Sequence, residues 1–478
     1  MATRREFIKN TTAVTLSMNL PGSFLKAQTS STFAANRPPV GKRTFVSTAV
    51  DQTIEQIKAR IKDPELAWMF ENCYPNTLDT TVDYEVIDGK PDTFVITGDI
   101  DAMWLRDSTC QVWPYMPLIR EDKSLALMIQ GLINRQAKCV NLDPYANAFY
   151  KDMSKESEWD SDRPQPQDGV HERKWEIDSL CYVVRLANEY YRLTSDASVF
   201  DADWDRAMHR IVETFKTEQR KDGTSPYRFI RETSRMTDAP VYEGTGRPSR
   251  PVGMICSMFR PSDDATVLPY LVPSNLFAVQ SLNQLAEIYA TVLKNDSFAK
   301  ACRDLANEVH DAIMHWGTAE HLIYGRIYAY EADGFGNHLF MDDANVPSLM
   351  SLSYLGVHIP QDPIYRRTRQ YLMSRDNPWY VRGKAAEGYG SPHTGKQGIW
   401  PMGIILRALT SDNQNEVLSC LHMLKATHAD TGFMHESFNK DNPNDFSRSW
   451  FAWANTLFGE LILKVNQDYP SLLNKKKI

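Results

Sequence analysis

Apolar residues recur along most of the chain with the spacing of α-helices. Leu125, Met128, Ile129 and Leu132 occupy positions i, i+3, i+4 and i+7, which places them on one face of a helix. Such spacing, together with apolar segments of helical length, predicts about a dozen helices. No fixed-length repeat accompanies them, so a simple solenoid is disfavoured. The predicted helices include residues 50–61, 64–72, 125–132, 180–187, 204–211, 282–289, 298–305, 344–356, 362–374, 398–409, 413–427 and 449–465.

Few segments have the composition of β-strands. Residues 84–87 (YEVI) and 93–96 (TFVI) flank the turn-like sequence Asp88-Gly89-Lys90-Pro91 and therefore predict a small β-hairpin. A second pair of strands is predicted within residues 322–330.

Long segments rich in Trp, Asp, Arg, Gly and Pro separate several of the predicted helices. Loops of this length in a compact domain are usually functional or disordered, and the many aromatic residues argue against disorder. The pattern predicts an all-α fold in which six inner and six outer helices form an (α/α)6 barrel, with the loops at one end meeting over a central pocket. A generic all-α fold is the alternative. The long segments are residues 143–176, 220–274, 376–398 and 428–449.

The charge balance narrows the class of partner. The 478 residues carry a formal net charge of −7, and 42% of them are hydrophobic and 24% charged, which is ordinary for a globular protein with a sizeable core. There is no large basic excess, so nucleic acid is not expected as a partner. The sequence does not indicate an oligomeric state.

The first residues have the pattern of an export signal. Residues 3–9 (TRREFIK) closely match the twin-arginine pattern, and a mild apolar stretch follows at residues 12–20. That stretch is too short and too polar to be a stable membrane span. We therefore predict a twin-arginine signal peptide at residues 1–30 and one catalytic domain at residues 31–478. The mature protein is expected to be periplasmic or secreted and to fold before export.

The seven cysteines are scattered and form no CxxC pair or Cys/His cluster. Neither a zinc site nor a disulfide framework is indicated. Most of the cysteines are expected to be small buried apolar residues. We expect neither a metal nor a cofactor.

Three clusters combine acidic side chains with aromatic or basic ones at predicted junctions between loops and helices. Alone, each cluster could be a helix cap or a structural ion pair. Together they predict one cleft lined by acids and stacking faces. The clusters are residues 97–108 (TGDIDAMWLRDS), 259–265 (FRPSDDA), and 434–438 (MHESF) with 447–453 (SRSWFAW).

Carboxylates among aromatic residues suit the hydrolysis of glycosidic bonds. The reaction needs one protonated acid near the leaving oxygen and one ionised carboxylate, and in inverting enzymes the two lie about 6.5–9.5 Å apart. The candidates are Asp263 or Asp264 for the acid and Glu436 for the base. An adjacent carboxylate raises the pKa of an acid, which could keep one aspartate protonated near neutral pH. His435 and Ser437 could hold the base.

Five motifs follow one another along the chain: FENCYPNTLDTT (70–81), TGDIDAMWLRDS (97–108), HERKWEIDS (171–179), FRPSDDA (259–265), and HESF (435–438) with RSWFAWANTLF (448–458). In this order they resemble glycoside hydrolase family 125. The resemblance implies an (α/α)6 barrel and an exo-acting, inverting α-mannosidase that favours α-1,6 linkages and works without a metal. It also places the acid in FRPSDDA and makes Glu436 the base. Asp263 is favoured as the acid, with Asp264 as the alternative.

Residue type and position within these motifs predict the substrate contacts. The expected ligand is a mannose-containing oligosaccharide, such as an N-glycan or mannan fragment. Asp and Arg side chains can clamp its hydroxyls, and Trp faces can cover the apolar side of a sugar ring. The alternatives are an α/α-barrel hydrolase of α-glucosides and a periplasmic glycan-binding protein without activity. The predicted binding residues are Asp101, Trp104, Arg106, Asp107, Glu176, Asp178, Arg260, Asp264, His393 and His435.

Overall fold

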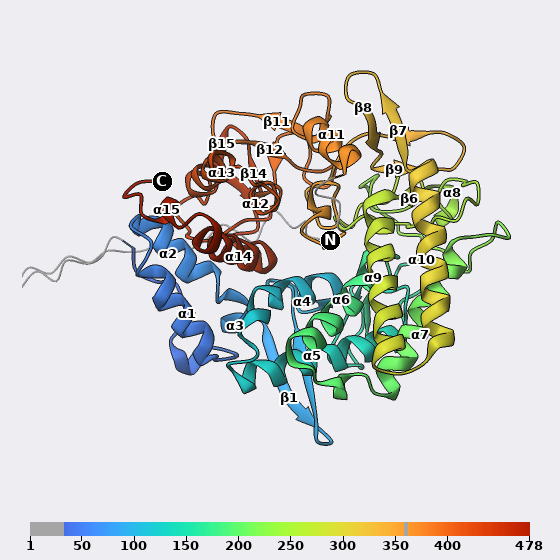
Figure 1. The fold of residues 1–478 in the computed structure, drawn as a ribbon, viewed down its shortest axis with the longest axis horizontal. Helices are drawn as coiled ribbons and strands as arrows, with labels where there is room; N and C mark the ends of the chain where they lie inside the picture. The colour runs from blue at the N-terminus through green and yellow to red at the C-terminus, as the bar shows by residue number, and fades with distance from the viewer. Residues whose placement is uncertain (1–32, 358–361) are drawn as a thin grey trace, which may run out of the picture. The chain divides into compact units, whose positions relative to one another are not determined.

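Five helices and a short 3-10 segment form a closed ring in the computed structural model, which describes residues 33–357 and 362–478. Each member packs against the next, and the last returns to the first. The chain therefore runs once around the barrel, as the colour gradient in Figure 1 shows. In order, the ring consists of α4 (Leu105–Val112), α6 (Ile177–Thr194), α9 (Val272–Thr291), η4 (Met350–Leu352), α12 (Pro401–Leu409) and α14 (Ala452–Asp468).

An outer layer of helices covers this ring. Most of these helices are amphipathic, because one face packs on the ring and the other meets solvent. Helix α2 packs on α14, α5 on α6, α10 on α9 and α13 on α12. The two layers confirm the predicted (α/α)6 barrel. The outer helices are α1 (Thr48–Lys58), α2 (Pro64–Cys73), α5 (Lys123–Leu142), α7 (Ala202–Glu218), α10 (Asp296–Trp316), α11 (Pro363–Leu372) and α13 (Gln414–Ala426).

The inner and outer helices begin differently. Most outer helices start at an Asp or Asn whose side chain accepts backbone N–H groups of the first turn. The five inner helices have no such side-chain cap. Three of them follow directly after, or one residue after, a short strand: β3 (Met103–Trp104), β6 (Tyr270–Leu271) and β13 (Gly398–Ile399).

These short strands join the long loops to the ring. Three-stranded sheets are formed by β3 with β4 (Ala148–Phe149) and β5 (Val170–Glu172), by β6 with β9 (Glu331–Ala332) and β10 (His338–Leu339), and by β13 with β14 (Ser437–Asn439) and β15 (Asn442–Ser447). Backbone carbonyls of the loops accept the first N–H groups of the helices, as between Leu105 N and Asn147 O at 3.1 Å. The sheets thus fix the loops over one end of the ring.

The predicted hairpin is confirmed as β1 (Val82–Ile87) and β2 (Lys90–Val95), with Ile87 opposite Lys90. Asp88 and Gly89 at its turn both have positive φ, as a two-residue turn of type I′ requires. The second predicted pair is displaced. Its strands are β7 (Thr318–His321) and β8 (Gly325–Tyr328), and the turn occupies the start of the predicted segment.

The helix predicted at residues 344–356 is wrong. Only η4 forms there, because the Asp342 carboxylate accepts the N–H groups of Leu349 and Met350 at 2.9 and 3.1 Å and delays the first turn. Pro347 also lacks the N–H that a helix interior needs. The apolar spacing of the sequence predicts a helix here, but it does not show that the Asp342 carboxylate competes for the backbone N–H groups.

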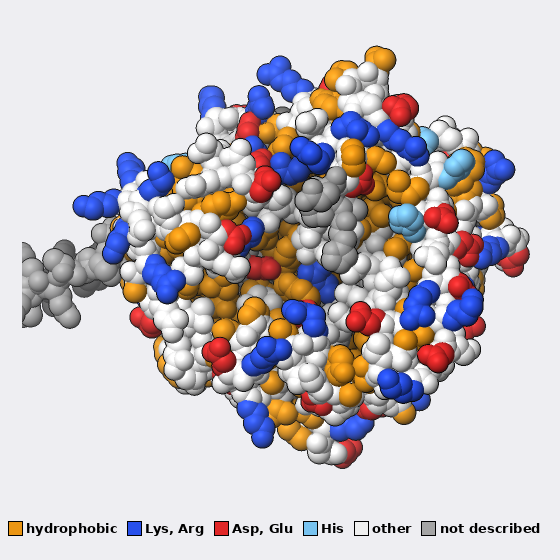
Figure 2. All heavy atoms as spheres, viewed as in Figure 1, with side chains coloured by type: hydrophobic (Ala, Val, Ile, Leu, Met, Phe, Trp, Pro, Cys, Tyr) orange, Lys and Arg blue, Asp and Glu red, His pale blue; other side chains and the backbone are white. Residues whose placement is uncertain are grey.

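Residues Ala35–Ile478 form one compact unit. The predicted signal peptide, residues 1–30, lies outside the described residues. None of the helices in the described part of the chain has the length and apolarity needed to cross a membrane. On the face drawn in Figure 2, acidic and basic side chains are interspersed.

Candidate active site

A pocket opens at the N-terminal ends of the inner helices and encloses about 400 Å³, its mouth included. Helix α4 supplies Arg106 and Asp107, and α14 supplies Trp453. The loops supply the other side chains, so residues distant in sequence meet in one cavity. The lining comprises Thr97, Ile100, Trp104, Arg106, Asp107, Pro261, Ser262, Asp263, Asn345, His393, Trp400, Glu436, Arg448, Phe451 and Trp453.

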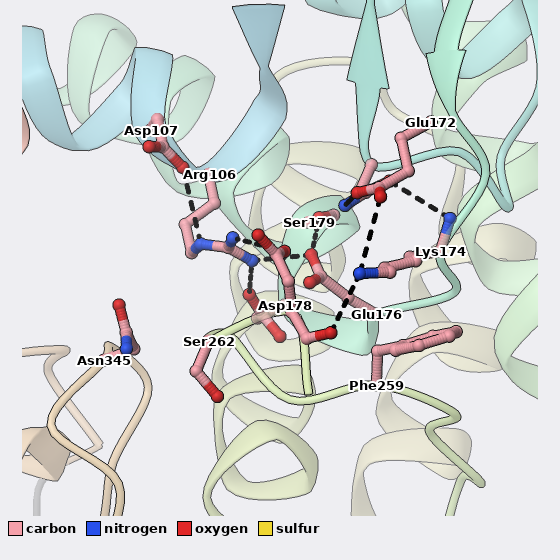
Figure 3. A network of polar contacts seen from close by, with 12 residues as sticks. Arg106, Asp107, Glu172, Lys174, Glu176, Asp178, Ser179, Phe259, Ser262 and Asn345 are labelled. Atoms are coloured by element: carbon pink, nitrogen blue, oxygen red, sulfur yellow. Dashed lines mark hydrogen bonds and ion pairs between the residues drawn. The ribbon is translucent and has the colours of Figure 1, made fainter. Parts of the chain in front are cut away.

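The Arg106 guanidinium lies at the floor of this pocket among four carboxyl groups. Its Nη1 donates to Glu176 at 2.6 Å and to Asp178 at 3.2 Å. Its Nη2 donates to Asp263 at 3.4 Å, and its Nε lies 3.5 Å from Asp107. In Figure 3, Glu176 and Asp178 point at the guanidinium from the start of α6. Arg106 therefore connects the pocket to a layer of acids behind it.

Burial dominates the electrostatics of these acids. It raises the pKa of Glu176 well above its ordinary value, although Arg106 opposes the shift. It also raises the pKa of Asp178 to about 6 and, less strongly, that of Asp107. Carboxyl groups next to a single cation in a buried space therefore retain protons more readily than in water.

Asp263 and Asp264 are adjacent, yet they have different surroundings. Asp263 lines the pocket, and 28% of its side chain is accessible. Asp264 lies outside the lining with 1% accessible. Its Oδ1 is 3.4 Å from His393 Nδ1 and 3.8 Å from Arg235 Nη2. Of the two, Asp263 is the one placed to reach a substrate.

Asp264 and His393 stabilise each other's charge. Burial alone would raise the pKa of Asp264, but the His393 ring 3.4 Å away lowers it below its usual range. Burial alone would lower the pKa of His393, but Asp264 raises it. The pair therefore fixes His393 at the pocket wall, and Asp264 acts from behind it.

The backbone of Asp263 adopts the left-handed conformation, with φ of 66°. Few residues other than glycine do so, although aspartate is among the more tolerant. The Asp263 N–H donates to Arg260 O at 2.9 Å, and the Lys174 ammonium donates to the Asp263 carbonyl at 3.0 Å. Lys174 is buried and also pairs with Asp238 at 2.8 Å and Glu172 at 3.4 Å. This ionic cluster anchors the turn that carries Asp263.

Glu436 lines the pocket from the segment before β14. Ser447 Oγ donates to its Oε2 at 2.9 Å, and Arg448 Nη1 lies 3.6 Å from its Oε1. Arg448 is held in turn by Asp99 and lies over the Phe451 ring at 4.6 Å. The contacts to Glu436 are with donors, which suits a carboxylate that accepts a proton.

His435 lies next to Glu436 in sequence, but it does not line the pocket. Its ring stacks on Phe446 with centroids 3.8 Å apart, and its nitrogens face the carbonyl oxygens of Arg448 at 3.1 Å and His428 at 3.3 Å. Burial lowers its pKa. His435 therefore lies behind the pocket lining, where it supports the segment that carries Glu436.

Arg260 and Asp101 also lie outside the lining. The buried Arg260 donates to Glu331 at 2.6 Å. The Asp101 side chain is 80% accessible and pairs with Lys155. Of the predicted binding residues, Trp104, Arg106, Asp107 and His393 line the pocket, whereas Asp101, Glu176, Asp178, Arg260, Asp264 and His435 do not.

Sequence reasoning missed several residues of the lining. Arg448 and Trp453 lie within the last motif, where their neighbours gave the signal but no role was assigned. Asn345 and Trp400 lie in no motif, and only the fold brings them to the pocket. Among residues 33–357 and 362–478, no three His, Cys, Asp or Glu side chains are grouped so as to hold a metal ion.

Comparison with known proteins adds independent information. Residues 63–463 match the profile of glycoside hydrolase family 125, described as metal-independent α-mannosidases. The chain is 42% identical over 459 residues to the meiotically up-regulated gene 157 protein of Schizosaccharomyces pombe, covering 92% of this chain and 90% of that protein.

Two solved structures are also similar. A Streptococcus pneumoniae metal-independent α-mannosidase, solved in a non-productive complex with α-1,6-mannobiose, shares 39% identity with a TM-score of 0.84, covering 88% of this chain and 99% of that chain. A bacterial glucoamylase solved with acarbose shares 13% identity with a TM-score of 0.51, covering 90% of this chain and 59% of that one, which is a likeness of fold alone.

Proposed function

The chain belongs to glycoside hydrolase family 125, the metal-independent α-mannosidases, and we propose that it removes α-1,6-linked mannose from the non-reducing ends of glycans with inversion. The observation that carries this proposal is the meeting of Asp263 and Glu436 in one pocket, although their segments lie far apart in the sequence. Family membership favours an α-mannosidase over the α-glucosidase and the inactive glycan-binding protein considered from the sequence.

In this proposal Asp263 is the general acid and Glu436 the general base. Asp263 donates a proton to the glycosidic oxygen as the bond to the anomeric carbon breaks. Glu436 takes a proton from a water that attacks the opposite face of the sugar. Mannose then leaves with inverted configuration, and the two carboxyl groups exchange one proton each with solvent before the next cycle.

The pocket suits a single terminal sugar. Trp104 and Trp453 present aromatic surface that can cover the apolar side of a mannose ring. Arg106 and Asp107 can hold its hydroxyls with charge-assisted hydrogen bonds. The ring of inner helices closes the floor, which supports removal of sugars from a chain end. The α-1,6 linkage is proposed because the Streptococcus pneumoniae relative was solved with α-1,6-mannobiose.

Substitution of the two carboxyl groups tests the assignment. We expect Glu436→Gln and Asp263→Asn each to lower the turnover of α-1,6-mannobiose by at least about 10³-fold without loss of folded structure. Asp264→Asn is the matched control beside the acid, and we expect it to retain more activity than Asp263→Asn. Near-normal turnover by Asp263→Asn with loss of turnover by Asp264→Asn would transfer the acid role to Asp264.

Two further measurements test stereochemistry and specificity. Proton NMR of the first-formed mannose should show the β anomer, and an α anomer would rule out inversion. A panel of α-1,2-, α-1,3- and α-1,6-mannobioses with matched α-glucosides should give the highest kcat/KM for the α-1,6-mannobiose. Cleavage of internal bonds in a longer mannan would contradict exo action.

We also propose that residues 1–30 direct twin-arginine export of the folded protein. All seven cysteines are buried free thiols in the structure, as expected of a protein that folds in a reducing compartment. Replacement of Arg4 and Arg5 by Lys should retain the protein inside the cell, as measured by fractionation. Unchanged export of that variant would overturn the proposal.

A further inference from the structure

The acids around Arg106 outnumber the cations. Glu176, Asp178, Asp263 and Asp107 all lie within 3.5 Å of its guanidinium. The next cation, Lys174, lies beside this cluster of acids, but it forms ion pairs with Asp238 and Glu172. Four ionised carboxylates on one buried cation would leave several uncompensated charges, which is costly in a buried space. At least one of these groups therefore holds a proton.

Hydrogen bonding identifies Glu176 as a partner in holding that proton. Its Oε2 accepts from Arg106 at 2.6 Å and from Ser179 at 2.8 Å, whereas its Oε1 is buried and meets no donor. Asp178 instead accepts on both oxygens, from Arg106 and, at 3.4 Å, from Ser274. An orphaned carboxyl oxygen is satisfied if it carries a proton and donates it.

The acceptor for that proton is Asp263. The Glu176 and Asp263 carboxyl groups accept from the two Nη atoms of the same guanidinium, at 2.6 and 3.4 Å, so they lie close together, an arrangement that two ionised groups would make unfavourable. Burial, the nearby Asp178 and Asp263 all raise the pKa of Glu176. In Figure 3, Glu176 lies between Arg106 on one side and Lys174 on the other, fully enclosed by protein.

We propose that Glu176 and Asp263 share one proton, and that Glu176 is a positioning residue that keeps Asp263 protonated beside the cationic Arg106. This inference rests on the proposed role of Asp263 as the acid. When the shared proton passes from Asp263 to the glycosidic oxygen, Glu176 and Asp263 are both left as carboxylates beside Arg106. A proton from solvent then restores the shared state through Asp263, which is the member that reaches the pocket.

The proposal has a direct consequence for pH dependence. Removing the shared proton leaves two carboxylates side by side, so it is held to higher pH than the proton of a single aspartate beside an arginine. In Glu176→Gln the amide oxygen can replace Oε2, and the amide N–H can donate to Asp263. That donor stabilises ionised Asp263, so the acid loses its proton at lower pH.

Kinetics provide the first test. We expect the alkaline limb of the kcat profile on α-1,6-mannobiose to move down by at least about one pH unit in Glu176→Gln, a tenfold loss of turnover at a fixed pH on that limb. The acidic limb, set by the base, should not move. Glu460→Gln is the matched control, because Glu460 is another carboxyl of the barrel with a raised pKa, about 7, and lies outside the pocket lining. If Glu176→Gln lowered kcat by the same factor at every pH and left both limbs of the profile in place, the proposal would be overturned.

Infrared difference spectroscopy provides a test that does not depend on activity. In the Glu460→Gln background at pH 7, adding Glu176→Gln should remove one component of the protonated carboxylic acid band, and adding Asp263→Asn should shift that component. Asp342, whose pKa is also raised by burial, contributes to the band that remains. Asp263→Asn leaves Glu176 buried beside Arg106 and replaces the carboxyl group that shares its proton with an amide. A band that both replacements leave unchanged would overturn the shared proton. Normal turnover by Asp263→Asn with the shifted component would instead reject the acid assignment and retain the pair.

Discussion

The starts of the outer and inner helices of the same barrel are built for different purposes. At the outer starts, Asp63, Asp122, Asp201, Asn295 and Asn413 satisfy the first N–H groups with their own side chains. At the inner starts, the corresponding positions are held by Trp104, Glu176, Leu271, Trp400 and Phe451, none of which caps its helix.

The inner helices begin without the stabilisation of a side-chain cap, and residues at their starts instead form the pocket. Trp104, Trp400 and Phe451 line the pocket, and Glu176 lies behind Arg106. Neighbouring loops accept the freed N–H groups instead, as Tyr330 O accepts from Val272 N at 2.9 Å. Helix starts with local caps thus serve stability, and starts tied to distant loops place chemical groups. Substitutions at the two kinds of start should separate stability from activity.

The largest effect is expected at an inner start. Arg106→Met should lower kcat/KM by at least about 10³-fold and destabilise the fold by about 3 kcal/mol, because it leaves buried carboxyl groups without their cation. Steady-state kinetics and urea unfolding measure the two effects. Arg106→Lys is the control that keeps the charge, and it should recover part of the stability. Full activity in Arg106→Met would show that the inner starts do not place the chemistry.

A carboxyl in the middle of an inner helix should affect stability rather than turnover. Glu460 in α14 accepts from Tyr354 at 2.9 Å, and burial raises its pKa to about 7 from an ordinary value of 4.5. A raised pKa in the folded state stabilises the protein below pH 4.5, and this contribution disappears as the pH rises through 7. In the parent protein the free energy of unfolding should therefore decrease between pH 4.5 and pH 8. In Glu460→Gln this decrease should be smaller by about 1–2 kcal/mol. An unchanged pH dependence of urea unfolding would contradict this.

An outer start should show the opposite balance to Arg106. The Asp201 carboxylate accepts from the N–H groups of Asp203 and Trp204, both at 3.0 Å, at the start of α7. Asp201→Ala should cost about 1 kcal/mol of unfolding free energy and leave kcat unchanged. Asp201→Asn retains the cap and serves as the control. A drop in kcat at full stability would break the distinction between the two kinds of start.

The smallest effect is expected at Asp101, which belongs to the motif before α4 but projects to solvent. Its ion pair with Lys155 is exposed, so Asp101→Asn should change the free energy of unfolding by less than about 0.5 kcal/mol. The change in kcat/KM should be equally small when it is expressed as an activation free energy. Thermal unfolding and kinetics on α-1,6-mannobiose check this together. A tenfold rise in KM would place Asp101 at the substrate after all.

The sequence was informative where one physical rule dominated. Outer helices such as α7 and α10 are amphipathic because they have one buried face, so their apolar spacing predicted them well. The fourth inner helix was not predictable, because Asp342 competes for the backbone of residues near Pro347. Apolar spacing does not record that competition.

The candidate site was predictable as a set of motifs but not as an arrangement. Spacing could not distinguish Asp263 from Asp264, because the difference arises from the left-handed backbone of Asp263 and its anchor at Lys174. Glu176 and Asp178 were expected to touch sugar, yet Arg106 stands between them and the pocket. Their residue type correctly indicated a polar contact, but only the fold shows that the contact is with Arg106 of the protein itself.

The closure of the ring by α14 has a consequence for how the molecule is made. Helix α14 packs against both α2 and α4, and Asn455 donates to Asn76 at 3.0 Å. No pocket exists until the last of these segments has been synthesised, because Trp453 and Glu436 complete a cavity that Arg106 begins. On the ribosome, the early helices therefore emerge before the segment that covers their apolar inner faces, and such exposed faces are the surfaces that chaperones shield.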